Sequence, residues 1–216
     1  FVTAQGFMEG TDTGAFLPES SLTRSQFAKI LYNMEGNPEA GNASTFTDVP
    51  TGKWYTDAVT WASNAGLVRG VGNGAFLPDE SIRRQDLIVM TYRYAQYKEC
   101  EITKRADLSS YQDAKNVAEY ALDAVQWAVA EGIIVGSAGQ LSPDREIQRC
   151  EAAELLMRLA EFITPSETEP TQPSENPSPV PGVPEEPDNP ETDEVNLNEY
   201  GLAEEVEDGT ILHAWC

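Results

Sequence analysis

The sequence has few positive charges and a single histidine. Its 216 residues include 14 lysines and arginines against 36 aspartates and glutamates, which gives a formal net charge of −22. A polyanion of this kind is repelled by phosphate backbones and by anionic lipid, so neither a nucleic-acid partner nor a membrane-surface role is expected. No apolar run approaches the roughly 20 residues that span a bilayer, and membrane insertion is therefore not expected.

The sequence also lacks the residue patterns of metal sites and of common enzymes. Cys100, Cys150 and Cys216 share no C-x-x-C spacing, so no metal site is expected, and three cysteines leave any disulfide pairing open. Neither His-Glu-x-x-His nor Gly-x-Ser-x-Gly occurs. The glycines at 70, 72 and 74 are not followed by the Lys-Ser/Thr of a phosphate loop. No catalytic residue and no cofactor are expected in this chain.

Proline and acidic residues are concentrated in the last quarter of the chain. Nine of the 14 prolines lie between positions 165 and 190, and residues 164–216 contain 14 acids with no lysine or arginine. A segment of this composition cannot bury enough apolar surface to collapse. We expect residues 164–194 to be a disordered Pro/Glu-rich linker that joins two different parts.

Before this linker the sequence repeats itself. The run Gly14-Ala15-Phe16-Leu17-Pro18 returns at residues 74–78 and, more loosely, at residues 139–143. An arginine stands six residues after the proline of each copy, at Arg24, Arg84 and Arg149. A period of 60 to 65 residues predicts stacked units that bury their apolar faces against one another.

Each unit has the pattern of two helices joined by a tight loop. Residues 54–65 carry apolar side chains at helical spacing, and Gly66 is placed to end that helix; residues 120–131 before Gly132 are the counterpart. The second helix of the first unit begins with the capping-box pattern Thr23-Arg24-Ser25-Gln26, and its equivalents are predicted at 87–97 and 152–163. Their spacing places Trp54, Trp61 and Trp127 in the core rather than on a sugar-binding surface. The fold class is therefore all-α.

These residues resemble the S-layer homology domain. Its motifs appear in the second unit as residues 46–49 (Phe-Thr-Asp-Val), Trp54, residues 66–70, residues 74–78 and residues 82–86. The resemblance divides the chain into a first repeat at 1–38 that lacks its opening, a second at 44–99 and a third at 108–163. The two aspartates of the opening motif, Asp48 and Asp113, are expected to cap the turn that follows them.

The resemblance implies an anchoring module for the cell surface. Members of the family pack three repeats as a pseudo-threefold helical prism and hold a secondary cell-wall polysaccharide, often pyruvylated, or a peptidoglycan-linked glycan, in the grooves between repeats. The chain is accordingly expected to be secreted and to lie at the cell wall or S-layer surface. The family's motifs assign ligand contact to nine residues: Arg24, Arg84, Arg149, Thr23, Gln26, Asp86, Glu151, Gly70 and Gly136.

Guanidinium groups suit ligand binding because they offer a planar fork of hydrogen-bond donors to a carboxylate. The alternative for each arginine is a solvated position or a helix-capping role. The third repeat departs from the family pattern, because Gln148 replaces the motif threonine and Leu141 replaces the loop aromatic. At least one groove is therefore expected to be degenerate.

Residues 195–216 point to a further, truncated domain. Their end, residues 210–216 (Thr-Ile-Leu-His-Ala-Trp-Cys), resembles the first strand of the catalytic barrel of bacterial alpha-amylases. That resemblance implies a parent glycoside hydrolase tethered to the cell surface. A structural S-layer protein is the remaining alternative.

Overall fold

The computed structural model describes residues 1–10, 14–43 and 46–164, and the regular secondary structure of these residues is helical. The α-helices are α1 (Arg24–Met34), α2 (Thr56–Asn64), α3 (Arg84–Tyr97), α4 (Leu122–Ala130) and α5 (Arg149–Ile163), and two 3-10 helices, Ala114–Asn116 and Glu119–Ala121, precede α4. Within this described part the extended pairings are isolated bridges and no sheet forms. The expected all-α class is confirmed. The predicted linker after Thr164 and the predicted amylase-like strand lie in residues 165–216, outside the described residues.

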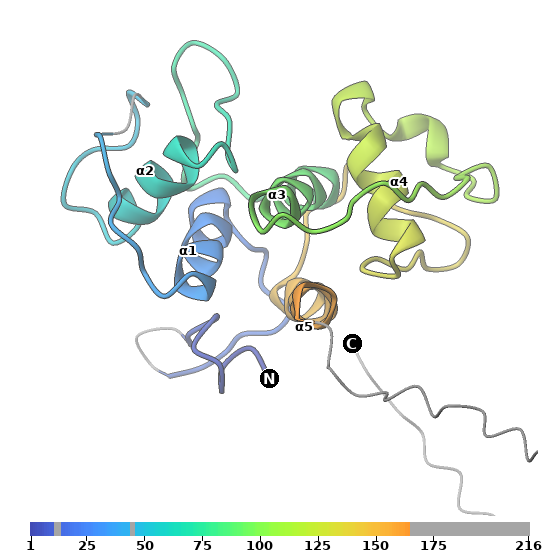
Figure 1. Ribbon diagram of the computed structural model, residues 1–216, viewed down its shortest axis with the longest axis horizontal. Helices are drawn as coiled ribbons and strands as arrows, with labels where there is room; N and C mark the ends of the chain where they lie inside the picture. Colours follow the sequence, from blue (N-terminus) through green and yellow to red (C-terminus); the bar gives the residue numbers. More distant parts are fainter. Residues whose placement is uncertain (11–13, 44–45, 165–216) are drawn as a thin grey trace, which may run out of the picture. The chain divides into compact units, whose positions relative to one another are not determined.

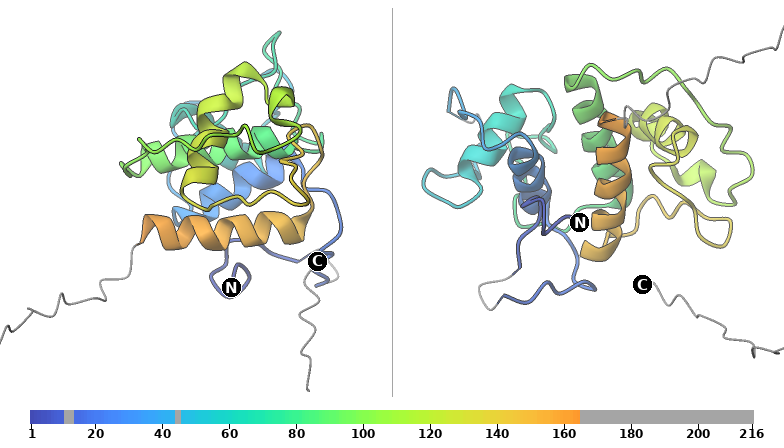
Figure 2. Two further views of the ribbon diagram at one scale, coloured as in Figure 1. Left: turned by 90° about the vertical axis from the view of Figure 1, so that its right-hand side faces the viewer. Right: turned by 60° about the horizontal axis from the view of Figure 1, so that its bottom comes forward.

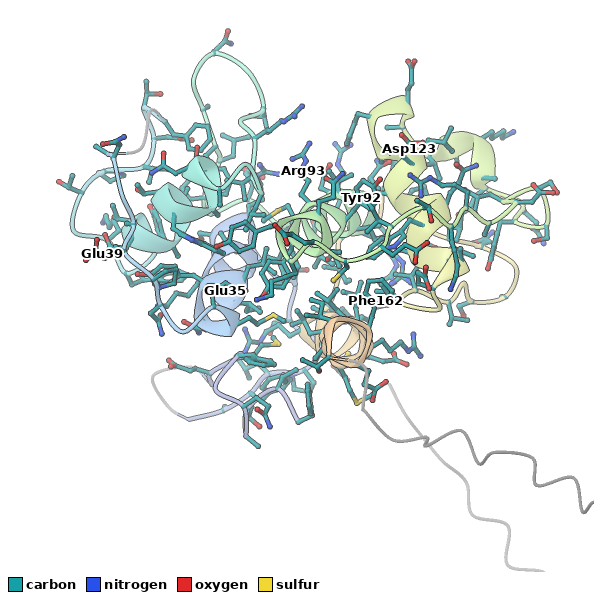
Figure 3. The ribbon with its side chains drawn as sticks, in the orientation of Figure 1. Glu35, Glu39, Tyr92, Arg93, Asp123 and Phe162 are labelled. Carbon is teal, nitrogen blue, oxygen red and sulfur yellow. The ribbon has the colours of Figure 1, made fainter. Side chains whose placement is uncertain are left out.

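Helices α1, α3 and α5 gather at the centre of this part of the chain, and α2 and α4 lie outside them (Figures 1 and 2). Aromatic pairs join the inner and outer helices. Tyr32 of α1 lies 5.7 Å from Trp61 of α2, and Tyr92 of α3 lies 5.3 Å from Trp127 of α4, measured between ring centroids. Phe162 brings α5 to the same tryptophan at 5.6 Å, and Figure 3 shows Tyr92 and Phe162 at this junction.

The local sequence signals act as predicted at several helix ends. The Thr23 hydroxyl accepts the Gln26 amide at 3.3 Å, and the Gln26 side chain accepts the Thr23 amide at 2.9 Å, which is a capping box. Gly66 has φ +74° directly after α2, a left-handed conformation that ends a helix at little cost for glycine. Residues 1–8, in contrast, form hydrogen-bonded turns, with Val2 and Met8 buried.

Three apolar residues meet at the centre of the fold. The amide of Leu22 donates to Ile147, that of Ile147 to Ile82 and that of Ile82 to Leu22, at 3.0, 3.2 and 2.8 Å. All three side chains are fully buried. These bonds close a ring that joins positions 60 to 125 residues apart in the sequence.

The inner helices extend this ring through their first turns. The first two amides of each helix donate to backbone carbonyls in the loop of another segment: Arg24 to Glu80, Ser25 to Pro78, Arg84 to Arg145, Gln85 to Pro143, Arg149 to Ser20 and Cys150 to Pro18, all at 2.8–3.0 Å. These donors are satisfied within the chain. They hold neighbouring segments together and are not available to a ligand.

Candidate functional site

Arg24 is held rigidly at the start of α1. Its Nε donates to the Phe76 carbonyl at 2.7 Å and its Nη2 to the Arg69 carbonyl at 3.1 Å. The guanidinium carbon lies 4.8 Å from the centre of the Phe76 ring. Burial lowers the pKa of Arg24 and Asp86 opposes the shift, but a guanidinium starts so high that it stays charged. Among the described residues Nη1 of Arg24 has no hydrogen-bond partner, whereas Nε and Nη2 each have one.

Arg149 at the start of α5 repeats this arrangement. Its Nε donates to the Phe16 carbonyl at 2.9 Å, its Nη2 donates to the Glu9 carbonyl at 2.7 Å, and its guanidinium lies 4.9 Å from the centre of the Phe16 ring. Two of the three predicted arginines therefore share one geometry, in which two backbone carbonyls and an aromatic ring fix the cation.

Arg84 has different partners. Leu141 occupies the aligned place of the loop aromatic, and the buried Nε of Arg84 has no hydrogen-bond partner within the described part of the chain. Its Nη2 donates to the Val135 carbonyl at 3.2 Å, while Nη1 lies 3.8 Å from the Glu151 carboxylate. The groove beside Arg84 is called the third groove below. Its cation thus faces a carboxylate of the same chain.

Glu151 is itself held by a second arginine. Arg145 donates to both of its oxygens at 2.5 and 3.0 Å, and the Gln148 amide adds a bond of 3.0 Å. Burial disfavours the charged form, but these bonds outweigh burial and hold the pKa of Glu151 below its usual range. Glu151 therefore remains an anion beside Arg84 at neutral pH.

Two cavities lie beside these arginines, one at Arg24 and one at Arg149. The larger of the two, about 590 Å³, lies beside Arg24 between the 69–71 loop and α3. Four arginines line it against two carboxylates: Arg24, Arg69, Arg83 and Arg93 against Glu80 and Asp86. Burial and the charge of Arg69 together lower the pKa of Arg93, which Figure 3 marks on α3. A chain that is strongly negative overall thus concentrates positive charge at this place.

An exposed aromatic ring stands at the rim of this cavity. Tyr120 is 61% exposed, and its hydroxyl donates to Asp86 at 2.6 Å. Partial burial of the hydroxyl, followed by its bond to Asp86, raises the pKa of Tyr120 to about 12, so the hydroxyl keeps its proton at neutral pH.

A second cavity, about 500 Å³, repeats the first beside Arg149. Its lining contains Gln26 and Asn33, at positions 60 residues before Asp86 and Arg93, and Trp54 stands at the rim in the aligned place of Tyr120. Trp54 is 59% exposed, so its predicted burial was wrong, whereas Trp61 and Trp127 are buried as expected. Trp54 lies in the turn before α2, where the helical spacing does not yet apply.

The predicted glycines have a steric reason. A Cβ atom on Gly70 would lie 2.7 Å from the Ala75 carbonyl oxygen. One on Gly136 would lie 2.7 Å from the Gln140 carbonyl oxygen and would overlap the Tyr111 ring. Of the two, Gly70 also lines the larger cavity. Both positions require glycine for loop packing, whatever they contribute to binding.

Of the nine predicted residues, the structure brings Arg24, Gly70 and Asp86 to the larger cavity and Gln26 and Arg149 to the smaller one. Thr23 caps α1, and Arg84 and Glu151 pair with each other. Sequence reasoning missed Arg69, Arg93 and Tyr120. Arg93 lies seven residues after Asp86 and three after Met90, which places all three on one helix face. That spacing was the one sequence signal that could have identified Arg93.

Comparison with known proteins shows what parts of this chain are similar to. The chain is 30% identical over 156 residues to an endoglucanase of Bacillus sp. strain KSM-635, covering 72% of this chain and 16% of that protein. Over 165 residues it is 27% identical to an amylopullulanase of Thermoanaerobacterium thermosulfurigenes, covering 74% and 9%. Over 161 residues it is 29% identical to a cellulosome-anchoring protein of Acetivibrio thermocellus, covering 72% and 35%.

The chain thus spans between about a tenth and a third of the length of these relatives. Surface-layer proteins of other bacteria are also similar, which supports the expected location at the cell surface. No described helix is both long and apolar enough to cross a bilayer. The model of the S-layer homology domain matches residues 45–88 and 110–153 of this chain.

Proposed function

We propose that residues 1–163 form three S-layer homology repeats that anchor a protein to the cell surface by binding an anionic cell-wall polysaccharide. The family match covers parts of the second and third repeats, and the closed ring of backbone bonds through Leu22, Ile82 and Ile147 supports the first as an equivalent unit. The similarity to a protein named as cellulosome-anchoring supports the anchoring role.

The observation that carries this proposal is the pair of equivalent cavities beside Arg24 and Arg149. Each combines a guanidinium oriented by two carbonyls with an exposed aromatic rim, Tyr120 in one and Trp54 in the other. A guanidinium suits a carboxylate, and an aromatic face suits the C–H groups of a sugar ring. An acidic saccharide, such as one carrying a pyruvate ketal, presents both chemistries within one residue.

The grooves are not expected to contribute equally. The cavity beside Arg24 has four arginines, whereas the one beside Arg149 has one lysine and one arginine against Glu9. In the third groove Glu151 already occupies the neighbourhood of Arg84 and would repel a carboxylate ligand. We therefore assign the tightest binding to the Arg24 cavity and little or none to Arg84.

The test is co-sedimentation of the full chain with purified cell-wall sacculi, before and after acid extraction of the secondary polymer. Binding should be lost on extraction. The paired change Arg69→Ala/Arg93→Ala should weaken binding about tenfold or more, because charge-assisted hydrogen bonds contribute roughly 1.5–3 kcal/mol each. The matched control, Lys104→Ala/Arg105→Ala, removes the same charge from residues that line neither cavity. Equal weakening by both pairs would refute the site.

A second proposal concerns the whole protein, for which we infer a cell-surface glycoside hydrolase. Two of the relatives are named as an endoglucanase and an amylopullulanase, and this chain covers only 16% and 9% of them. The alpha-amylase reading rests on residues 195–216 alone, and a surface-layer protein remains the competing reading because such proteins are also similar. Sequencing the gene past Cys216 decides between a catalytic domain and a long assembly region.

A further inference from the structure

The Asp48 carboxylate bridges two consecutive amides of a loop 28 residues further along the chain. Its Oδ1 accepts the Phe76 amide at 2.8 Å and its Oδ2 accepts the Leu77 amide at 2.7 Å. Leu77 has φ +60°, a left-handed conformation that costs energy for a branched side chain. The two hydrogen bonds therefore stabilise a backbone shape that this sequence would not adopt unaided.

Phe76 connects this carboxylate to Arg24. Its amide is held by Asp48, its carbonyl accepts Arg24 Nε at 2.7 Å, and its ring lies under the same guanidinium. Phe76 is fully buried and its ring stacks on Phe46 at 5.3 Å. The amide of Thr47 adds a bond of 2.9 Å to the Gly74 carbonyl. Residues 46–48 thus fix the loop on both sides of its contact with Arg24.

We propose that Asp48 is a positioning residue for the Arg24 cavity: it binds no ligand itself, but fixes the loop whose carbonyl and ring orient the guanidinium. This rests on the proposed function of the cavity. Burial disfavours the charged form of Asp48, but the two amide bonds and the charge of Arg24 outweigh burial and hold its pKa below the usual range. The carboxylate that makes both bonds is therefore the form present at neutral pH.

The chain contains its own control for a purely structural role. Asp113 accepts the amides of Leu141 and Ser142 at 2.8 and 2.7 Å, and Ser142 has φ +51°, so the local bonding is the same. Leu141 offers no ring, and the Nε of Arg84, the arginine that faces this loop, has no partner in the described structure. Asp113 therefore fixes its loop without orienting an arginine of the larger cavity.

The experiment compares Asp48→Asn with Asp113→Asn in the full chain. An asparagine can accept only one of the two amides and turns an N–H towards the other, so both variants should lose similar stability. Two quantities are then measured: hydrogen exchange of the Arg24 Nε–H by NMR without ligand, and co-sedimentation with unextracted sacculi. In Asp48→Asn we expect exchange to accelerate tenfold or more and binding to weaken about tenfold, with neither change in Asp113→Asn.

Unchanged Nε–H exchange in Asp48→Asn, or the same acceleration in both variants, would overturn the proposal. If the unaltered chain does not bind sacculi, the proposed function fails, and the exchange measurement still decides whether Asp48 positions Arg24. Should Asp48→Asn not fold, the comparison is made in a Leu77→Gly background, where glycine removes the cost of the positive φ without restoring a carboxylate.

Discussion

Ile82 lies in the central ring and gives a quantitative test of how the segments depend on one another. Its side chain is fully buried, and its backbone bonds to Leu22 and Ile147. Replacing a buried isoleucine by alanine costs roughly 2–5 kcal/mol, and we expect about 3 kcal/mol because backbone bonds prevent the ring from collapsing into the space. With a urea slope of about 2 kcal/mol per molar, the unfolding midpoint of Ile82→Ala should fall by about 1.5 M.

The assay is urea unfolding followed both by helical circular dichroism and by tryptophan fluorescence. The dichroism reports all the helices, whereas the fluorescence change comes mainly from the buried Trp61 and Trp127 in the outer helices. Both signals should shift together because the ring joins all segments. The exposed Val71 provides a control, and Val71→Ala should change stability by no more than about 0.5 kcal/mol. Two separate transitions in Ile82→Ala would refute the reasoning.

Two further predictions concern stability. Burial, followed by the bond to Glu35, raises the pKa of Tyr94, so its neutral form stabilises the fold below about pH 10 and that contribution is lost as the pH rises further. Tyr94→Phe should be about 1–2 kcal/mol less stable at pH 7 and lose stability less steeply above pH 10 in thermal unfolding; an equally steep loss contradicts this. Gly70→Ala should lower the melting temperature by several degrees, because the new Cβ meets the Ala75 carbonyl; calorimetry showing no change contradicts it.

The sequence predicted the helices well because their signals are local. The capping box at Thr23 and the glycine after α2 depend on residues within one turn, and both were found. The first residues of α2 to α5 differ from the predicted ones by two or three positions, as for α3, which begins at Arg84 where 87 was predicted, and the last residues differ by one at most. Trp54 was misplaced because a helical pattern was extended into the turn before α2.

The candidate site was predicted only in outline because its contacts are not local. The in-frame arginines indicated grooves, but their partners lie 45 to 140 residues away. Asp48 was expected to cap the next turn, yet it binds amides 28 residues later, and no spacing rule reveals that. The pairing of Arg145 with Glu151 had one visible sign: Arg145 stands where the aligned positions carry Ser20 and Glu80.

The contacts at the start of α5 have a mechanical consequence. Tension applied beyond Ile163 enters through the C-terminal end of this helix. The other end is tied by the amides of Arg149 and Cys150 and by the Arg149 guanidinium to the carbonyls of four residues of the first segment: Glu9, Phe16, Pro18 and Ser20. The force on α5 is therefore transmitted to the first segment of the fold, and α5 does not detach from the other helices by itself. The rate at which this part of the chain unfolds under tension is then set by the opening of the whole ring.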